Sequence, residues 1–150
     1  MSYEEEMDER EYSPSDEELT DLYHRVRTIA VVGASGDAAK AAHRIPKYLQ
    51  SAGYTITPVN PRGGELFGVP VVTSLAELDS APDVVDVFRP AAETPDIARA
   101  AVEAGAKVLW LQEGIYNDEA REIAEAAGLT VIMGRCMGAT HQMLGIGRVS

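Results

Sequence analysis

Short apolar runs alternate with amphipathic segments along most of the chain from Thr28 onwards. Apolar runs of this length, bounded by glycine, proline or asparagine, are typical of strands that are buried on both faces of a parallel sheet. The pattern predicts six strands, at about 28–33, 55–59, 69–72, 84–88, 107–111 and 130–133.

Between the predicted strands, apolar residues recur at helical spacing, which predicts helices that cover the sheet. The first main helix ends at Gly53, a longer one ends at Gly105, and the last clear one runs from Asn117 to Gly128. Because proline is tolerated in the first turn of a helix, Pro46 predicts that the first main helix begins near His43. A loop of about nine residues would then follow the first strand.

The chain divides into three parts by pattern. Residues 1–14 are acidic and lack apolar periodicity, which predicts a mobile tail. Ser15 and Glu18 have the spacing of a capping box, which predicts an N-terminal helix within 15–27. Residues 28–150 form the predicted domain.

The regular β-α-β series predicts an α/β fold in a single domain. Right-handed crossovers would arrange it as a doubly wound, mostly parallel, Rossmann-like sheet of five or six strands with helices on both faces. We predict the strand order 3-2-1-4-5. Ligands of such sheets bind outside the carboxyl ends of the strands, so the residues that follow each strand are the candidates for function.

The charge of the chain excludes some partners. A formal net charge of -11 disfavours nucleic acid and anionic membranes, which proteins bind through an excess of lysine and arginine. The N-terminus lacks the pattern of a signal peptide, no apolar run reaches the ~20 residues that span a bilayer, and Cys136 is the single cysteine. We therefore expect a cytoplasmic protein without an internal disulfide.

The same acidity permits two interpretations. A salt-adapted protein would use an acidic surface to stay soluble in concentrated salt, whereas an ordinary acidic cytosolic protein would not depend on salt. The sequence leaves both open.

The loop after the first strand contains Gly33, Ala34, Ser35 and Gly36. Glycine directly after a strand lets the backbone approach a ligand closely, often a phosphate, although the full G-x-G-x-x-G fingerprint of dinucleotide-binding domains is missing. His43 and Arg44 would lie at the positive end of the following helix, where they would either contact an anion or face solvent.

The second strand ends in Asn60, Pro61 and Arg62. Many NAD-binding domains place an aspartate or glutamate here to hold the ribose, so Asn60 argues against NAD. Arg62 could reach an additional phosphate or could be an ordinary surface arginine.

The later strand ends add a further group of candidates. They are Arg89 and Pro90, then Gln112, Glu113 and Gly114, and finally Cys136. His141 follows Cys136 closely, but no third member of a catalytic triad is evident, so an inert thiol is favoured over a nucleophile. Asp86, inside a buried strand, is interpreted as hydrogen-bonded structure.

Some chemistry is missing from the sequence. It has no P-loop motif and no spacing of histidine and cysteine that suggests a metal site, so we assign no catalytic residue and no metal ligand. What remains is the binding of a phosphorylated small molecule.

Five short motifs, each at a strand end, resemble a known family. VVGAS, PVNPR, VDVFRP, WLQEGI and GRC occur in the order seen in small stand-alone CoA-binding proteins. They are also similar to the CoA-binding domain of the succinyl-CoA synthetase α subunit, over about residues 28–144. The synthetase's phosphohistidine lies outside this region, so ligase activity is not implied.

The resemblance implies coenzyme A or acyl-CoA as the cofactor. The loop from Gly33 to Gly36 would hold its phosphates, and Arg62 would lie near them. Arg89-Pro90 and Gln112-Glu113 would line the adenine and pantetheine side, with Cys136 close by.

We therefore expect non-catalytic CoA binding, as a sensor or an accessory subunit, with a homodimer or a partner protein left open. The alternatives are an NAD(P)-linked oxidoreductase or a component of an acyl-CoA ligase. A nucleotide-reading repressor is disfavoured because no DNA-binding domain is evident and the N-terminal segment is acidic.

Overall fold

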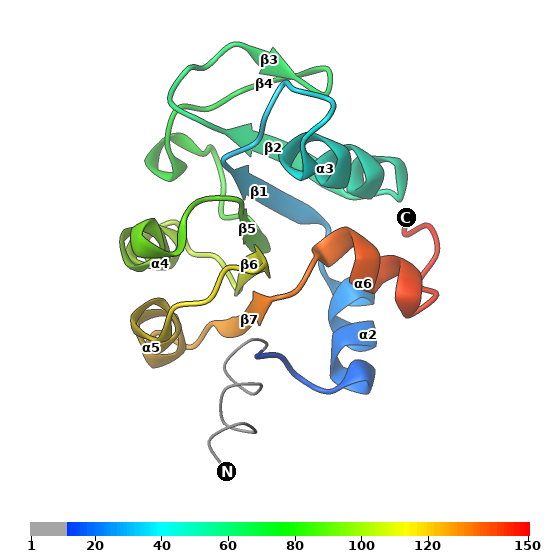
Figure 1. The fold of residues 1–150 in the computed structure, drawn as a ribbon, viewed down its shortest axis with the longest axis vertical. Helices are drawn as coiled ribbons and strands as arrows, with labels where there is room; N and C mark the ends of the chain where they lie inside the picture. Colours follow the sequence, from blue (N-terminus) through cyan, green and yellow to red (C-terminus); the bar gives the residue numbers. More distant parts are fainter. Residues whose placement is uncertain (1–11) are drawn as a thin grey trace.

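A parallel sheet forms the centre of the molecule (Figure 1). The computed structural model describes residues 12–150, so the predicted tail lies almost entirely outside the described residues. The sheet has five strands in the order β2-β1-β5-β6-β7, and all neighbouring strands run parallel. They are β1 (Thr28–Val32), β2 (Thr55–Val59), β5 (Val84–Val87), β6 (Val108–Glu113) and β7 (Thr130–Gly134).

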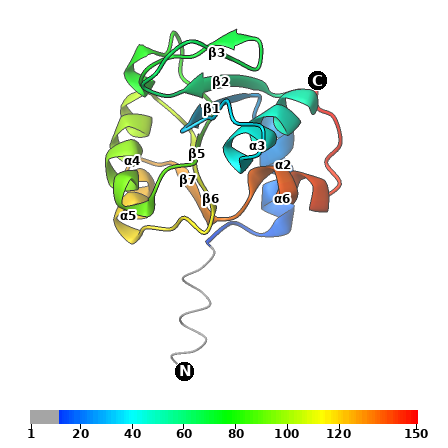
Figure 2. The same cartoon turned by 45° about the horizontal axis from the view of Figure 1, so that its top comes forward.

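Helices cover both faces of this sheet (Figures 1 and 2). One face packs against α2 (Asp16–Arg25), α3 (Ala41–Ser51) and α6 (Met137–Met143). The other face packs against α4 (Thr94–Glu103) and α5 (Asp118–Ala126). The predicted doubly wound, Rossmann-like α/β fold is therefore confirmed.

Alternation along the buried strands supplies both halves of the core. In β1, Ile29 and Val31 face the α2, α3 and α6 layer, while Ala30 faces α4 and α5. The first layer holds the large side chains, including Trp110 and Tyr23, whereas alanines of α4 and α5 let these helices lie close to the sheet. Because successive strand residues point to opposite faces, one apolar run fills two layers.

The predicted strand at 69–72 is wrong in its extent. It is replaced by a small antiparallel hairpin, β3 (Glu65–Leu66) with β4 (Val69–Pro70). Only Val72 pairs with the main sheet, as a single parallel bridge to Val59 of β2. The sequence correctly predicted β2 as the strand next to this segment. A longer ladder does not form, because Pro70 lacks the N–H that it would need.

The two ends of the described chain also differ from the predicted pattern. Tyr12, assigned to the tail, exchanges two backbone hydrogen bonds with Met133 of β7, of 3.0 and 2.8 Å. Helix α6 was not predicted: it has only seven residues, and its buried face is formed largely by Gly138, Thr140 and His141, which give no apolar pattern. Within residues 12–150, no helix is long and apolar enough to cross a bilayer.

Candidate functional site

The carboxyl ends of the strands surround two adjoining hollows. The larger hollow has a volume of about 720 Å³ and lies among the ends of β1 and β2 and the start of α4. The smaller hollow has a volume of about 360 Å³ and lies among the start of α3 and the ends of β5 and β6. Arg89 lines both hollows, so it marks the boundary between them.

Most of the predicted site residues line one of these hollows. The larger is lined by Gly33, Ala34, Ser35, Gly36, Asn60, Pro61, Arg62 and Arg89. The smaller is lined by Arg89, Pro90, Gln112, Glu113 and Cys136. His43, Arg44 and Gly114 line neither of the two.

Gly33 is required by its backbone and by its neighbours. Its φ is +91°, and a Cβ at this position would lie 2.7 Å from the carbonyl oxygen of Phe88 and 3.0 Å from Cδ of Arg89. Its N–H donates to the carbonyl of Val59 at 3.0 Å. The β1 and β5 ends therefore approach each other as only a glycine permits.

The loop after β1 is bonded to a carbonyl of the following helix that lacks its usual partner within the helix itself. Helix α3 begins at Ala41, not near His43 as predicted, so Pro46 lies beyond its first turn. Proline has no N–H to donate to the carbonyl of Ala42 four residues earlier. That carbonyl instead accepts a hydrogen bond of 3.2 Å from the N–H of Ser35, which ties the loop to the helix.

His43 and Arg44 contact their own loop. The imidazole of His43 forms a 2.8 Å hydrogen bond with the carbonyl of Ser35 and packs on Phe67, with 5.1 Å between ring centroids. A guanidinium N–H of Arg44 donates to the carbonyl of Ala39. These two side chains support the loop around the larger hollow.

Asn60 joins two of the loops that surround the larger hollow. Its amide nitrogen donates to the carbonyl of Ala34 at 3.2 Å, and its amide oxygen accepts from the backbone N–H of Arg62 at 2.8 Å. A carboxylate at this position could not donate to Ala34. The residue that argued against NAD therefore also holds the β1 and β2 loops together.

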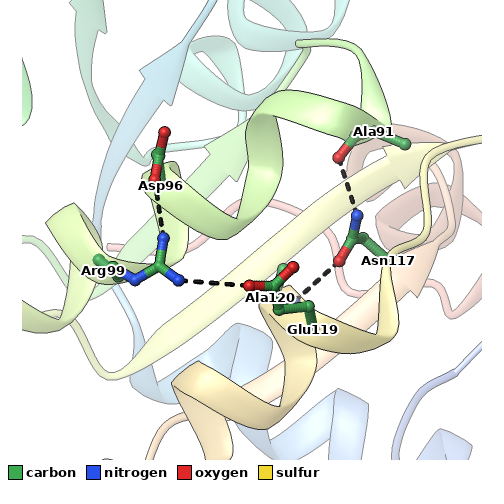
Figure 3. A network of polar contacts seen from close by, with 6 residues as sticks. All are labelled: Ala91, Asp96, Arg99, Asn117, Glu119 and Ala120. Atoms are coloured by element: carbon green, nitrogen blue, oxygen red, sulfur yellow. Dashed lines mark hydrogen bonds and ion pairs between the residues drawn. The ribbon is translucent and has the colours of Figure 1, made fainter.

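The larger hollow carries both signs of charge. Its cations are Lys40, Arg62 and Arg89, and its carboxylates are Glu93 and Asp96. Among residues 12–150, neither Lys40 nor Arg62 has a partner within ion-pair distance. Arg89 is paired with Glu93. Figure 3 shows Asp96 paired with Arg99, which also contacts Glu119.

The smaller hollow is mainly apolar. Its apolar walls are Ala41, Ala42, Phe88, Pro90 and Ile115. The Cys136 sulfur accepts a 3.4 Å hydrogen bond from the N–H of Ala139 at the start of α6. His141, the imidazole nearest to it in sequence, is buried and bonded to the hydroxyl of Tyr48 at 2.7 Å.

The side chain of Gln112 lines the smaller hollow, but both of its polar atoms are hydrogen-bonded within the protein. Its amide nitrogen donates to one carboxyl oxygen of Asp86, and its amide oxygen accepts from the N–H of Met137 at 3.3 Å. Asp86 is fully buried, and burial raises its pKa to about 7. This buried pair connects β5 and β6 to the start of α6.

Sequence reasoning missed three charged residues of the larger hollow, Lys40, Glu93 and Asp96. The spacing of Arg89 and Glu93, four residues apart, is a signal that could have suggested an ion pair. In residues 12–150, no cluster of three potential metal ligands occurs. The arrangement can bind an anionic group beside an apolar one.

The decisive comparison is with a family of CoA-binding domains. The family model described as "CoA binding domain" matches residues 27–142. The chain belongs to this CoA-binding domain family.

Two other proteins are similar to the chain over most of its length. The chain is 40% identical over 129 residues to the Bacillus subtilis (strain 168) protein called "Uncharacterized protein YneT", covering 86% of this chain and 96% of that one. A solved structure from Thermus thermophilus, described as cell-free ID.343, has a TM-score of 0.84 at 38% identity, covering 87% of this chain and 99% of the other.

A longer relative carries this unit as a part. An ADP-forming acetate–CoA ligase of Archaeoglobus fulgidus is 28% identical over 122 residues. The match covers 75% of this chain but only 18% of the ligase. Similarity therefore reaches one region of that enzyme.

Proposed function

We propose that the chain binds coenzyme A or an acyl-CoA without catalysing a reaction on it. The observation that carries this proposal is the pair of adjoining hollows at the carboxyl edge of the sheet, in a member of a CoA-binding family. The larger hollow carries cations, and the smaller one is walled mainly by apolar side chains. Coenzyme A has the same division, with phosphates on its nucleotide and an uncharged pantetheine arm.

The residues take roles that follow from their places. The Gly33–Gly36 loop would bind the phosphates in the larger hollow through the N–H groups of Ala34 and Gly36, because those of Gly33 and Ser35 already donate to backbone carbonyls. The side chains of Arg62 and Lys40 would add charge-assisted contacts. The pantetheine arm would pass Arg89 and enter the smaller hollow between Pro90 and Ile115. Cys136 and Glu113 would then lie near the thiol end.

A non-catalytic role is supported by the environment of the candidate groups. The imidazole of His141 is engaged by Tyr48, and Gln112 is engaged by Asp86 and Met137. Within the described part of the chain, the hydrogen bond of the Cys136 sulfur comes from the N–H of Ala139, and no base is bonded to the sulfur to activate it.

Calorimetric titration tests the ligand directly. The purified chain should bind CoA and acetyl-CoA, and it should bind NAD⁺, NADH and ATP more weakly. Tight NADH binding without a response to CoA would overturn the proposal.

Arg62→Ala tests the role of the exposed cation in the larger hollow. If Arg62 pairs with the 3′-phosphate, this variant should weaken CoA binding by about 1–3 kcal/mol and leave dephospho-CoA binding nearly unchanged. Arg25→Ala is the matched control, because Arg25 is exposed on α2 and lines neither hollow. Equal losses for both ligands would reject the assignment.

The ligase relative supports a second candidate, a CoA-binding part of an acyl-CoA ligase assembly. The chain spans 18% of that enzyme, so the proposal expects no ligase reaction from the chain alone. Formation of ATP from acetyl-CoA, ADP and phosphate that requires both this chain and a separate ligase subunit would favour this candidate instead.

A further inference from the structure

Arg89 is bound by a carboxylate of the proposed site itself. Its Nε and Nη2 donate to the two oxygens of Glu93, at 2.9 and 2.8 Å. This edge of the guanidinium is one with which arginine binds two oxygens of a phosphate group. Glu93 therefore occupies the Nε–Nη2 edge of Arg89, an edge with which this guanidinium could bind a diphosphate in the larger hollow.

Glu93 is held in place by the turn that carries it. The 3-10 turn η2 (Ala91–Glu93) begins at Ala91, whose carbonyl accepts from Asn117 at 3.1 Å and from Thr94 at 2.6 Å. Figure 3 shows the Asn117 side chain between Ala91 and Ala120 at the start of α5. The Glu93 backbone is thus anchored to the covering layer, while its carboxylate reaches the hollow.

The ion pair itself is easily exchanged. The side chains of Arg89 and Glu93 are 46% and 48% exposed, and solvated pairs of this kind contribute little stability. Asp96 differs, because its partner Arg99 lines neither hollow and also contacts Glu119. Glu93 is therefore the carboxylate that competes with a ligand for a cation of the site.

We infer that the Glu93 carboxylate competes with the diphosphate of the ligand for Arg89. Glu93 binds Arg89 when no ligand is bound and releases Arg89 when the ligand binds. This inference rests on the proposed CoA binding and deepens it by naming a residue that sets its affinity. Arg89 lies at the boundary of the two hollows, against Gly33 of the phosphate loop. Binding of a diphosphate there exchanges one anionic partner of Arg89 for another.

Glu93→Gln tests the exchange. Removal of the competing charge should tighten binding of CoA and of dephospho-CoA by a similar factor, about two- to five-fold. Pantetheine, which has no phosphate, should bind unchanged. Glu103→Gln is the matched control, since it removes the same charge from the far end of α4 and lines neither hollow.

Testing Glu93→Gln in an Arg89→Ala chain distinguishes competition for Arg89 from direct repulsion between Glu93 and the phosphate. In Arg89→Ala, Glu93 has no arginine to release, so adding Glu93→Gln should change CoA affinity much less than it does in the natural chain. An equal gain in both backgrounds would overturn the inference, because Glu93 would then act on the phosphate directly. Weaker or unchanged CoA binding by Glu93→Gln alone would overturn it as well.

The two proposals fail in distinguishable ways. If the natural chain gives no calorimetric response to CoA, the proposed function itself is wrong. If the natural chain binds CoA but Glu93→Gln behaves like Glu103→Gln, only the exchange is wrong.

Discussion

Two side-chain amides at the carboxyl edge of the sheet form hydrogen bonds that connect neighbouring segments of the candidate site. Asn60 joins the β1 and β2 loops, and Gln112 joins Asp86 to the start of α6. Both follow or end a strand, so the sequence marked their positions. Their partners Ala34, Asp86 and Met137 lie 25 or 26 residues away in the chain, so only the folded structure could show these contacts.

Asp86 makes stability depend on pH. In the folded protein, burial raises the pKa of Asp86 to about 7, from a usual value of 3.8. Between these values the folded state binds a proton that the unfolded state has lost, so stability falls as pH rises.

Asp86→Asn should remove that dependence. Relative to the variant, the natural chain should lose about 1.4 kcal/mol of unfolding free energy per pH unit between about pH 5 and 7. Denaturant unfolding at several pH values measures this, with Asp21→Asn on the surface of α2 as the control. A difference between Asp86→Asn and the natural chain that is constant with pH would contradict the prediction.

At the scale of elements, local signals succeeded where an element depends on its own residues. The capping box at Ser15 was predicted and is present: Glu18 N–H donates to the Ser15 hydroxyl oxygen at 3.2 Å, and Ser15 N–H donates to Glu18 at 3.0 Å. The start of α3 was predicted wrongly, because Ser35 provides the hydrogen bond that Pro46 cannot. A proline is tolerated inside a helix when another donor uses the vacant carbonyl.

Ser15→Ala should destabilise the fold through α2. Loss of the cap should lower the free energy of unfolding by about 0.5–2 kcal/mol, because α2 buries Leu19, Leu22 and Tyr23 against the sheet. Ser15→Thr, which keeps a capping hydroxyl, is the control in thermal or denaturant unfolding. Equal losses in both variants would show that the cap is not the cause.

At the scale of the whole molecule, the large negative net charge affects stability. With a formal charge of -11, like charges repel one another in the compact state, and added salt screens that repulsion. Salt adaptation stays a prediction of the acidic composition.

The melting temperature should therefore rise with added KCl at neutral pH. Near pH 4.6, the isoelectric point of the sequence, the same salt should have little effect, because the net charge is close to zero. Thermal unfolding across a KCl series at both pH values measures this. A melting temperature that does not rise with KCl at neutral pH would favour an ordinary acidic protein.

The sequence by itself determined the parallel sheet, its doubly wound helices and most residues at its carboxyl edge. Apolar runs, glycine stops and capping residues act over a few neighbours, so they can be recognised without the fold. The pairing of Arg89 with Glu93 is of this local kind as well, although only its place in the hollow suggests the role that we infer for it.

Tertiary structure decided the remainder. It reduced the predicted strand at 69–72 to a single bridge, brought Lys40 into the larger hollow, and turned His43 and Arg44 onto their own loop. It also divided the candidate residues between two hollows that meet at Arg89. These outcomes depend on contacts between distant segments, which form only when the sheet brings the strand ends together.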